Sequence, residues 1–304
     1  MNPKYDALEL ARILGEPKDP KKPYPDVLTA ICQTDTAEPN EYVYYFDALV
    51  ETDKVYVITS SGAVTQENVS PDTPVLLTFV DLASPEYYVK LTDLASAKER
   101  TLARKIATIN RAMNAYETYK VVQLIDAAVP AANKFTLTSG YTRFTYENLV
   151  YMIDSITDYA DGYNLLAGST IDRDIKLWDW NDNKYTSLAS ALNDLNVTIH
   201  RQIGQVTIDS VATDILPATY AYLVGTSTAM GKPVLWVRKK LNDIDFLGGA
   251  LYENGEKPER LVFVSPNPVQ VEGVNRFLAV GITGFEEFAA AVVNPYALAR
   301  FIRS

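Results

Sequence analysis

The chain has 304 residues, of which 47% are hydrophobic and 22% charged, and this is typical of a globular protein with one large domain or two ordinary ones. The formal net charge of −10 disfavours a dedicated reader of DNA sequence, because such proteins carry a basic patch. The single cysteine, Cys32, excludes an intrachain disulfide, and the lack of a signal sequence and of a long apolar run predicts neither secretion nor a membrane span.

The first 40 residues are expected to be irregular. Residues 2–14 could form a short helix, but the following stretch 16–25 has four prolines in ten residues. Proline lacks a backbone N–H and fixes its own φ angle, so this stretch is predicted to be an extended arm. Such an arm is either a loose terminus or a segment that lies along another subunit.

Residues 41–92 are predicted to be mostly β-structure. They are rich in β-branched and aromatic residues, with small polar residues between 60 and 73 that indicate a loop or a hairpin tip. The expected strands are 42–50, 54–59, 74–82 and 87–91.

A helix much longer than average is predicted from residue 96 to residue 128. The segment contains no proline or glycine, and Pro130 should end it. At 1.5 Å per residue it would run on the order of 45 Å, whereas the average globular helix has only about 11–12 residues. Apolar residues recur at spacings of three and four, which predicts one buried side. These residues are Leu102, Ile106, Ile109, Met113 and Tyr116, with Leu124 continuing roughly along that side.

The second half of the chain has a mixed α/β pattern. Helices are predicted at 146–160 and 188–196, with a turn at 168–170 between them. Strands are predicted at 197–208, 233–238 and 260–264, and the chain ends in the apolar segments 277–282, 285–293 and 294–302. No internal repeat is present.

The usual signatures of catalysis and cofactor binding are not found. A single histidine, His200, cannot supply a common zinc or iron site, and its strand-like surroundings favour a structural role. No Gly-x-Ser-x-Gly elbow is present to serve a catalytic triad. The stretch 225–232 ends in Gly-Lys, but Pro233 stands where a phosphate loop needs a hydroxyl, so a loop before a strand is expected. We therefore predict no metal, no cofactor and no enzymatic activity.

Carboxylates offer the only alternative site. Four aspartates gather around two tryptophans: Asp172, Asp174, Asp179 and Asp182 beside Trp178 and Trp180. Such a group could bind a divalent cation or a sugar. However, Arg173 and Lys176 lie among the aspartates and would partly neutralise them, which favours a solvated loop with local salt bridges. The adjacent Glu286 and Glu287 are expected to be a solvent-facing pair.

The order of these elements resembles that of the HK97-like major capsid proteins of tailed bacteriophages. In that family an N-terminal arm, an extended β-hairpin loop, a long spine helix in a peripheral domain and an axial α/β domain follow one another, and a closing strand returns to the periphery. Local sequence agrees, because 144–149 and 164–169 look like the helix and strand that open the axial domain, and 284–296 is similar to phage capsid C-termini.

The resemblance implies an α+β fold with defined boundaries. The N-terminal arm would be 1–40 and the extended loop region 41–80. The peripheral domain would comprise 81–132 and 281–304, with the spine helix at 96–128, and the axial domain would be 133–280.

The resemblance also implies the function. The chain would assemble in the host cytoplasm into hexamers and pentamers of an icosahedral shell, part of the virion, that encloses double-stranded DNA without reading its sequence. Implied partners are a separate scaffolding protein and a portal, with decoration proteins as a further option, and no membrane. Aromatic and basic residues of the arm and loop are the candidate intersubunit contacts: Tyr24, Tyr42, Tyr44, Tyr45, Phe46 and Lys54. Some members cross-link a loop lysine, but Lys54 is the one lysine in 41–80 and we predict no cross-link.

Two alternatives remain open at this stage. An encapsulin-type nanocompartment has the same fold and encloses protein cargo instead of DNA. A cytosolic α/β enzyme or ligand-binding protein would use the carboxylate cluster near Trp178 and Trp180.

Overall fold

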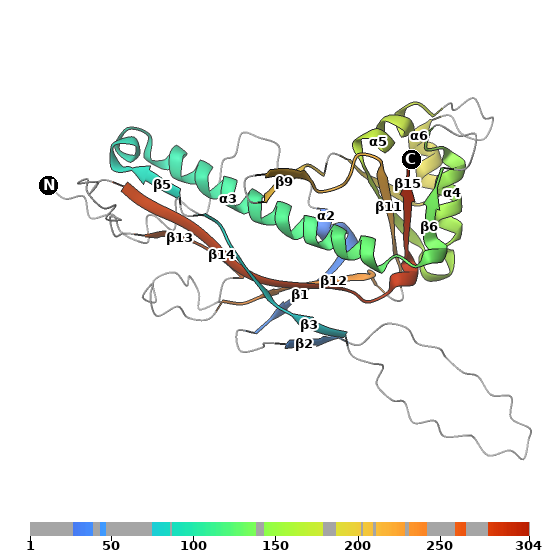
Figure 1. The fold of residues 1–304 in the computed structure, drawn as a ribbon, viewed down its shortest axis with the longest axis horizontal. Coiled ribbons are helices and arrows are strands. Elements are labelled where there is room, and N and C mark those ends of the chain that lie inside the picture. The colour runs from blue at the N-terminus through green and yellow to red at the C-terminus, as the bar shows by residue number, and fades with distance from the viewer. Residues whose placement is uncertain are drawn as a thin grey trace, which may run out of the picture.

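The computed structural model describes residues 27–38, 43–46, 75–85, 87–137, 143–178, 187–201, 203–208, 211–228, 231–241, 259–265 and 279–303. Two sheets are linked by one long helix, which lies along the first sheet and ends at the second (Figure 1). The fold is therefore of the mixed α+β class, as the sequence predicts.

The long helix is α3, Leu91–Ala128, with 38 residues. It ends at the predicted residue and begins five residues earlier than the predicted Ser96. It leaves the helical path just before Pro130, which has extended backbone geometry (φ −61°, ψ 152°). Within the described part of the chain, neither this helix nor any other is long and apolar enough to cross a bilayer.

The buried side of α3 changes along its length. Ile106, Ile109 and Met113 are buried as predicted, whereas Leu124, expected on the same side, is 37% exposed. The last turns instead bury Val121, Val122, Ile125 and Val129. At 100° per residue, the buried side has rotated by about a third of a turn. The reason is that this part of the helix packs in one core cluster with both sheets, with Trp236 and Phe288 of the first and Leu166 and Tyr222 of the second.

The first sheet has six strands, with the order β1-β12-β14-β13 and with β4 and β5 also paired to β14. The strands are β1 (Cys32–Ala37), β4 (Val80–Ala83), β5 (Tyr87–Lys90), β12 (Val234–Lys239), β13 (Arg260–Ser265) and β14 (Ala279–Val292). The segment predicted as two apolar pieces is thus one 14-residue strand, β14, which runs along α3 (Figure 1). Because it pairs with four other strands, β14 is the centre of this sheet.

The second sheet has five strands, in the order β6-β15-β11-β7-β8. They are β6 (Lys134–Thr136), β7 (Gly162–Ala167), β8 (Val197–Arg201), β11 (Tyr220–Thr226) and β15 (Leu298–Ile302). Helices α4 (Tyr146–Asp154), α5 (Ser169–Lys176) and α6 (Leu188–Asp194) lie on the side of this sheet away from α3 (Figure 1). Side chains of each strand point alternately to the two faces of this sheet. Leu165 and Leu223 pack toward these helices, while Leu166 and Tyr222 join the core around α3.

Short elements complete the fold. They are the 3-10 turns η1 (Ala131–Asn133), η2 (Thr157–Tyr159) and η5 (Pro295–Ala297), the antiparallel pair β9 (Gln205–Ile208) and β10 (Val211–Asp214), and the antiparallel pair β2 (Val43–Phe46) and β3 (Val75–Thr78). The predicted helix 146–160 is divided into α4 and η2. The predicted strand 74–82 is divided into β3 and β4.

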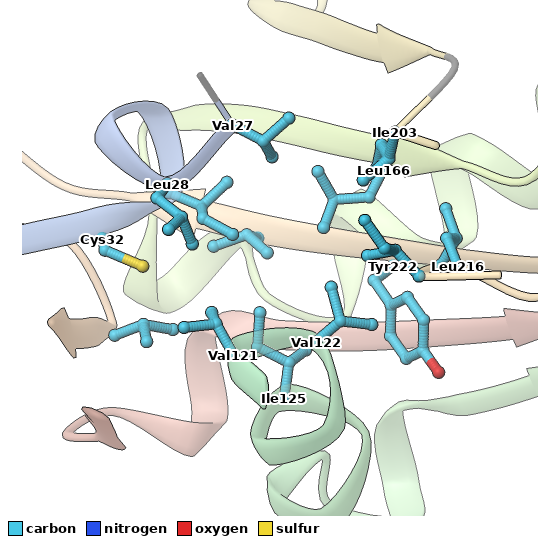
Figure 2. Close-up of a cluster of buried hydrophobic side chains, with 14 of the residues drawn as sticks. Val27, Leu28, Cys32, Val121, Val122, Ile125, Leu166, Ile203, Leu216 and Tyr222 are labelled. Atoms are coloured by element: carbon cyan, nitrogen blue, oxygen red, sulfur yellow. The ribbon is translucent and has the colours of Figure 1, made fainter. Parts of the chain in front are cut away.

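Residues 27–37 correct the prediction of an irregular N-terminal segment. They form the short helix α2 (Val27–Ile31) followed by β1. Val27, Leu28 and Ile31 are buried and belong to the same core cluster as Ile125 of α3. Figure 2 shows Val27 and Leu28 in this core. The proline-rich stretch 16–25 ends at Pro25, so the residues directly after it are free to form regular structure. The predicted arm residues before Val27 lie outside the described residues.

The two sheets do not coincide with the predicted domain boundaries. Strands β12 and β13, expected in the axial segment 133–280, belong to the first sheet with β14. Strand β15, expected in the returning segment 281–304, belongs to the second sheet. The chain thus passes between the sheets three times after α3 begins: from α3 to β6, from β11 to β12, and from β14 to β15.

Candidate functional site

The β2–β3 pair is the described base of the predicted extended loop. Phe46 lies opposite Val75 in the antiparallel register, so residues 47–74 leave and return at neighbouring strand ends. Leu77 of β3 is 2% exposed and packs with Leu235 and Val237 of β12. The pair therefore lies on the face of the first sheet opposite to α3 (Figure 1).

Three of the six candidate intersubunit residues lie on β2. Tyr44, Tyr45 and Phe46 are paired with Leu77, Leu76 and Val75 of β3 respectively. Tyr24, Tyr42 and Lys54 lie outside the described residues. The structure thus brings three candidates together at the base of the loop, and their contact with a neighbouring subunit stays a prediction.

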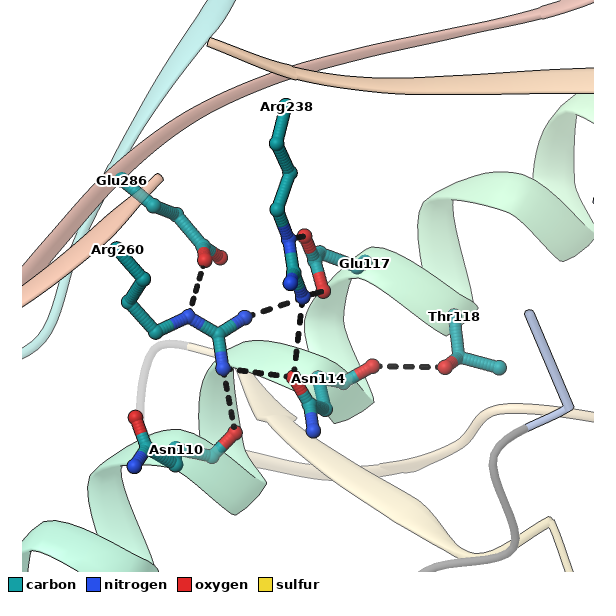
Figure 3. A network of polar contacts seen from close by, with 7 residues as sticks. All are labelled: Asn110, Asn114, Glu117, Thr118, Arg238, Arg260 and Glu286. Atoms are coloured by element: carbon teal, nitrogen blue, oxygen red, sulfur yellow. Dashed lines mark hydrogen bonds and ion pairs between the residues drawn. The ribbon is translucent and has the colours of Figure 1, made fainter. Parts of the chain in front are cut away.

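A buried ion network fixes the spine helix α3 to the first sheet (Figure 3). Arg238 of this network follows Val237 on β12 and so points away from the face where Val237 packs with Leu77 of β3. Glu117 of α3 is fully buried and accepts hydrogen bonds from Arg238 Nε at 3.0 Å and Arg238 Nη2 at 2.8 Å. Arg260 Nη2 donates to the same carboxylate at 3.2 Å. Asn114, one turn earlier in α3, accepts from Arg260 Nη1 at 2.7 Å. One helical carboxylate therefore ties two strands, β12 and β13, to the helix.

Glu286 of β14 completes this network and corrects a prediction. It was expected to face solvent with Glu287, but it is fully buried and pairs with Arg260 Nε. Adjacent residues of a strand point to opposite faces, so Glu286 faces α3 while Glu287 pairs with Lys239 at 2.8 Å. Burial, together with the nearby carboxylate of Glu117, raises the pKa of Glu286. Its Oε1 has no hydrogen-bond partner among the described residues.

The raised pKa of Glu286 predicts a specific pH dependence. The folded chain binds this proton more tightly than the unfolded chain, so the free energy of unfolding should fall as pH rises from the ordinary glutamate value of 4.5 through the raised pKa. Glu286→Gln removes this contribution. In urea titrations of the unassembled chain, the stability of wild type relative to Glu286→Gln should decrease by about 1.4 kcal/mol per pH unit within that window.

The half-buried Glu287 provides the control for this titration. Glu287→Gln is the matched substitution at the neighbouring position, where the carboxylate keeps solvent contact and a lysine partner. A stability difference between wild type and Glu286→Gln that stays flat, or grows as pH rises, would contradict the assignment.

A second cluster of polar side chains joins α3 to the second sheet. Asp126, near the end of α3, accepts from the hydroxyl of Tyr222 on β11 at 2.9 Å and from Arg300 Nη1 on β15 at 2.6 Å. Asn133, just after the helix, donates to the carbonyl of Leu298 at 3.0 Å. Burial and the bond to Asp126 raise the pKa of Tyr222 above its usual range, so the phenol stays protonated and donates. This group sets the position of the helix end on the second sheet.

Removing the hydroxyl of Tyr222 tests the contact between α3 and the second sheet. Tyr222→Phe should reduce the free energy of unfolding by about 1 kcal/mol, because Asp126 loses one donor while the ring keeps its packing. Chemical denaturation of the unassembled chain measures the change. Tyr151→Phe is the matched control, because Tyr151 is 61% exposed and should show no measurable change. Equal effects of the two substitutions would rule out a structural role for the Tyr222 hydroxyl.

The described part of the carboxylate cluster is occupied by internal partners. Asp172 pairs with Lys176 at 2.6 Å and with Arg201 at 3.0 Å. Asp174 accepts from the backbone N–H of Phe144 at 3.0 Å and pairs with Arg303 at 2.9 Å. Within the described residues, no group of three histidine, cysteine or acidic side chains could hold a metal ion. The predicted Asp179, Trp180 and Asp182 lie outside the described residues.

The remaining candidates lie in structural positions. His200 lies on β8, with its Nε2 2.9 Å from Asn164 Oδ1, and burial lowers its pKa. The stretch 225–232 is a tight connection from β11 to β12, closed by two backbone hydrogen bonds between Ser227 and Gly231. Gly231 has a φ of 76°, which suits this turn, and Lys232 bonds to the carbonyl of Thr29. This geometry fits the predicted loop before a strand.

Glu117, Arg238 and Arg260 are not among the residues that the sequence patterns single out. One signal was present, because Glu117 lies four residues after Met113, within the apolar stripe of the helix. A charged residue on a buried helix face requires a partner of opposite charge. Its partners could not be found this way, because they lie 121 and 143 residues further along the chain.

Comparison with known proteins gives matches at the level of structure alone. No protein-family model and no curated protein sequence matches the chain. Among solved structures, the mature capsid of bacteriophage PhiM1 is 11% identical, with a TM-score of 0.59, over 94% of this chain and 89% of that one. The structure titled Mycobacterium phage Adephagia is 10% identical, with a TM-score of 0.58, over 100% and 95%. A virus-like particle from Pyrococcus furiosus is 11% identical, with a TM-score of 0.55, over 97% and 99%.

These matches define the class of the fold. The matches extend over 94–100% of this chain and 89–99% of the matched chains, so they concern the arrangement of the whole chain and not one segment. The fold is the HK97-like fold of phage capsid proteins, as the order of elements in the sequence predicted.

Proposed function

We propose that the chain is a major capsid protein that self-assembles into hexamers and pentamers of an icosahedral shell around double-stranded DNA. The observation that carries this proposal is the structural match over 94% of the chain to the mature capsid of bacteriophage PhiM1, beside the match over 100% of the chain to the structure titled Mycobacterium phage Adephagia. A match of that extent leaves little of the chain for a separate catalytic domain. The acidic net charge of −10 suits a shell that encloses DNA without gripping its sequence.

The described geometry supports two structural units within the subunit. The first sheet, α3 and the ion network would form a rigid peripheral unit, and the second sheet with α4, α5 and α6 would form the axial unit that faces the capsomer centre. We propose that β12, β13 and β14 belong to the peripheral unit and β15 to the axial unit, because each strand pairs within that sheet. Under this proposal the units would not be divided at 133 and 281.

Intersubunit contacts are proposed at the β2–β3 pair and in the segment that it holds. A loop that leaves and returns at one antiparallel pair can extend over a neighbour and add strand pairing and buried area there. Aromatic residues are enriched at such interfaces, which favours Tyr44, Tyr45 and Phe46 as anchors. The residues Tyr24, Tyr42 and Lys54 stay as candidates from the sequence.

The proposal includes partners, location and the absence of catalysis. A separate scaffolding protein, a portal and decoration proteins would act with the chain, which would assemble in the host cytoplasm and remain in the virion. No enzymatic role is proposed, and the internal ion pairs of Asp172 and Asp174 speak against the alternative of a ligand-binding carboxylate site.

Particle content tests this function against the nanocompartment alternative. Particles produced in an infected or induced host should sediment as shells and yield double-stranded DNA that resists nuclease until the shell is opened. Shells that hold protein cargo and no protected DNA would instead identify an encapsulin-type compartment. A chain that stays a monomer or dimer in the presence of its scaffolding protein would refute both.

A further inference from the structure

A cavity of about 210 Å³ lies at the start of α2, between this helix and the spine helix α3. The apolar part of its lining includes Val27 and Leu28 of α2, Ala115 of α3, and Ile203. Figure 2 shows Val27, Leu28 and Ile203 in this part of the core. Because an apolar cavity of about 150 Å³ can hold a benzene molecule, this one is large enough for an aromatic side chain.

The cavity also has a polar side, formed by α3 and the ion network. Asn114 and Thr118 line it from successive turns of α3, and Figure 3 shows both residues with the arginines of the network. The Thr118 hydroxyl donates to the Asn114 carbonyl at 2.7 Å, so its oxygen keeps the capacity to accept a hydrogen bond. The network itself has two acidic and two basic side chains: Glu117, Glu286, Arg238 and Arg260. A neutral group with an apolar body and one hydroxyl therefore suits this lining better than a charged group.

The sequence places such a group close to the cavity. Tyr24, which lies outside the described residues, precedes the lining residue Val27 by three positions. An extended chain spans at most about 3.6 Å per residue, so the Tyr24 Cα lies within about 11 Å of the Val27 Cα. The short connection makes loop closure cheap in chain entropy, and Pro25 further restricts the backbone of Tyr24. The other tyrosine in residues 1–26, Tyr5, lies much earlier in the chain and lacks both advantages.

We propose that Tyr24 binds in this cavity of its own subunit, with its ring against Leu28, Ala115 and Ile203 and its hydroxyl donating to Thr118. Tyrosine combines a large apolar ring with a polar end, which matches the two sides of the cavity. The contact would hold the start of α2 against α3 and set the point from which residues 1–23 extend. Of the candidate intersubunit residues, Tyr24 would thus serve its own subunit.

Binding of p-cresol, which has the shape of a tyrosine side chain, tests whether Tyr24 occupies the cavity. In the full-length, unassembled Tyr24→Ala chain the cavity should be open, and an NMR titration should give a Kd of about 1 mM, as expected for a ligand of this size. Wild type should bind p-cresol at least about tenfold more weakly, because the Tyr24 side chain competes from within the same chain. Tyr5→Ala is the matched control and should behave as wild type.

A second comparison locates the hydroxyl in the cavity. Toluene, which lacks the hydroxyl, should bind the Tyr24→Ala chain about three to ten times more weakly than p-cresol, because it cannot donate to Thr118. Adding Thr118→Val should remove this difference between the two ligands. A difference that persists in the double variant would overturn the assignment of Thr118 as the partner of the hydroxyl.

Three results would overturn the proposal as a whole. Equal p-cresol affinity of wild type and Tyr24→Ala would show that Tyr24 leaves the cavity open, and no binding to a folded Tyr24→Ala chain would show that the cavity does not accept a phenol. Exclusion of p-cresol from wild type that is lost on dilution would assign the cavity to the arm of a neighbouring subunit. If Tyr24→Ala does not fold, Tyr24→Phe takes its place: loss of the hydroxyl should raise the p-cresol affinity above that of wild type, and an unchanged affinity would contradict the proposal. Each measurement uses the unassembled chain, so none of these results depends on whether the chain forms a shell.

Discussion

Replacing Glu117 by glutamine is expected to destabilise the unassembled subunit by about 3–5 kcal/mol. The substitution keeps the shape of the side chain and removes the one carboxylate that accepts from both Arg238 and Arg260. Those arginine side chains are only 20% and 13% exposed, so solvent compensates poorly for the lost partner. Removing one member of a buried ion pair is strongly destabilising because it leaves an uncompensated buried charge. Urea unfolding of the unassembled chain measures the difference.

An exposed ion pair of the same chain provides the control for Glu117→Gln. Glu38 pairs with Lys240 at 2.6 Å, but its side chain is 62% exposed. Glu38→Gln should therefore change the free energy of unfolding by less than about 1 kcal/mol. A loss at Glu117 no larger than the loss at Glu38 would show that the network does not hold the helix to the sheet.

Replacing Gly284 by alanine should push the spine helix away from the first sheet. A Cβ at this position of β14 would lie 2.5 Å from Ile109 Cγ2 and 3.0 Å from Met113 Sδ, both on the buried face of α3. The glycine thus allows the strand to lie directly against the helix. Overpacking of this kind costs about 1–3 kcal/mol, and denaturation of the unassembled chain should show that loss.

Two further variants show whether the cause is this contact. Gly162→Ala, also in a strand, places its Cβ near the ends of the Thr226 and Asn196 side chains, which can move, so a smaller loss is expected. Ile109→Ala removes the obstructing methyl group. The loss of unfolding free energy in the double variant with Gly284→Ala should therefore be smaller than the sum of the two single-variant losses, by about 1 kcal/mol or more. If the two losses simply add, the destabilisation by Gly284→Ala does not come from its contact with Ile109.

The features that the sequence predicts well are those specified by local pattern. The long helix follows from its apolar spacing and from Pro130, and strands are also predicted at 197–208, 233–238 and 260–264, whereas β11 is not. The helix α2 was missed because five residues are too few to establish a period, and it is stabilised by burial of Val27 and Ile31 against α3. Its structure is a consequence of tertiary packing and not of local preference.

The parts of the site that could not be predicted depend on contacts between distant segments. Glu286 beside Glu287 suggested a solvated pair, whereas strand alternation sends one of them into the core. The pairing of Glu117 with Arg238 and Arg260 requires knowing that β12, β13 and β14 are neighbours, and strand order is set by the whole fold. The network is therefore a property of the assembled sheet.

Imaging of the full-length chain produced with its scaffolding protein tests the central claim most directly. Electron microscopy should show closed icosahedral shells in which α3 and the first sheet of each subunit can be traced, with the segment held by β2 and β3 lying over a neighbouring subunit. Particles of uniform size built from hexamers and pentamers are the predicted result. A homogeneous monomer or dimer near 34 kDa under the same conditions would contradict the capsid function.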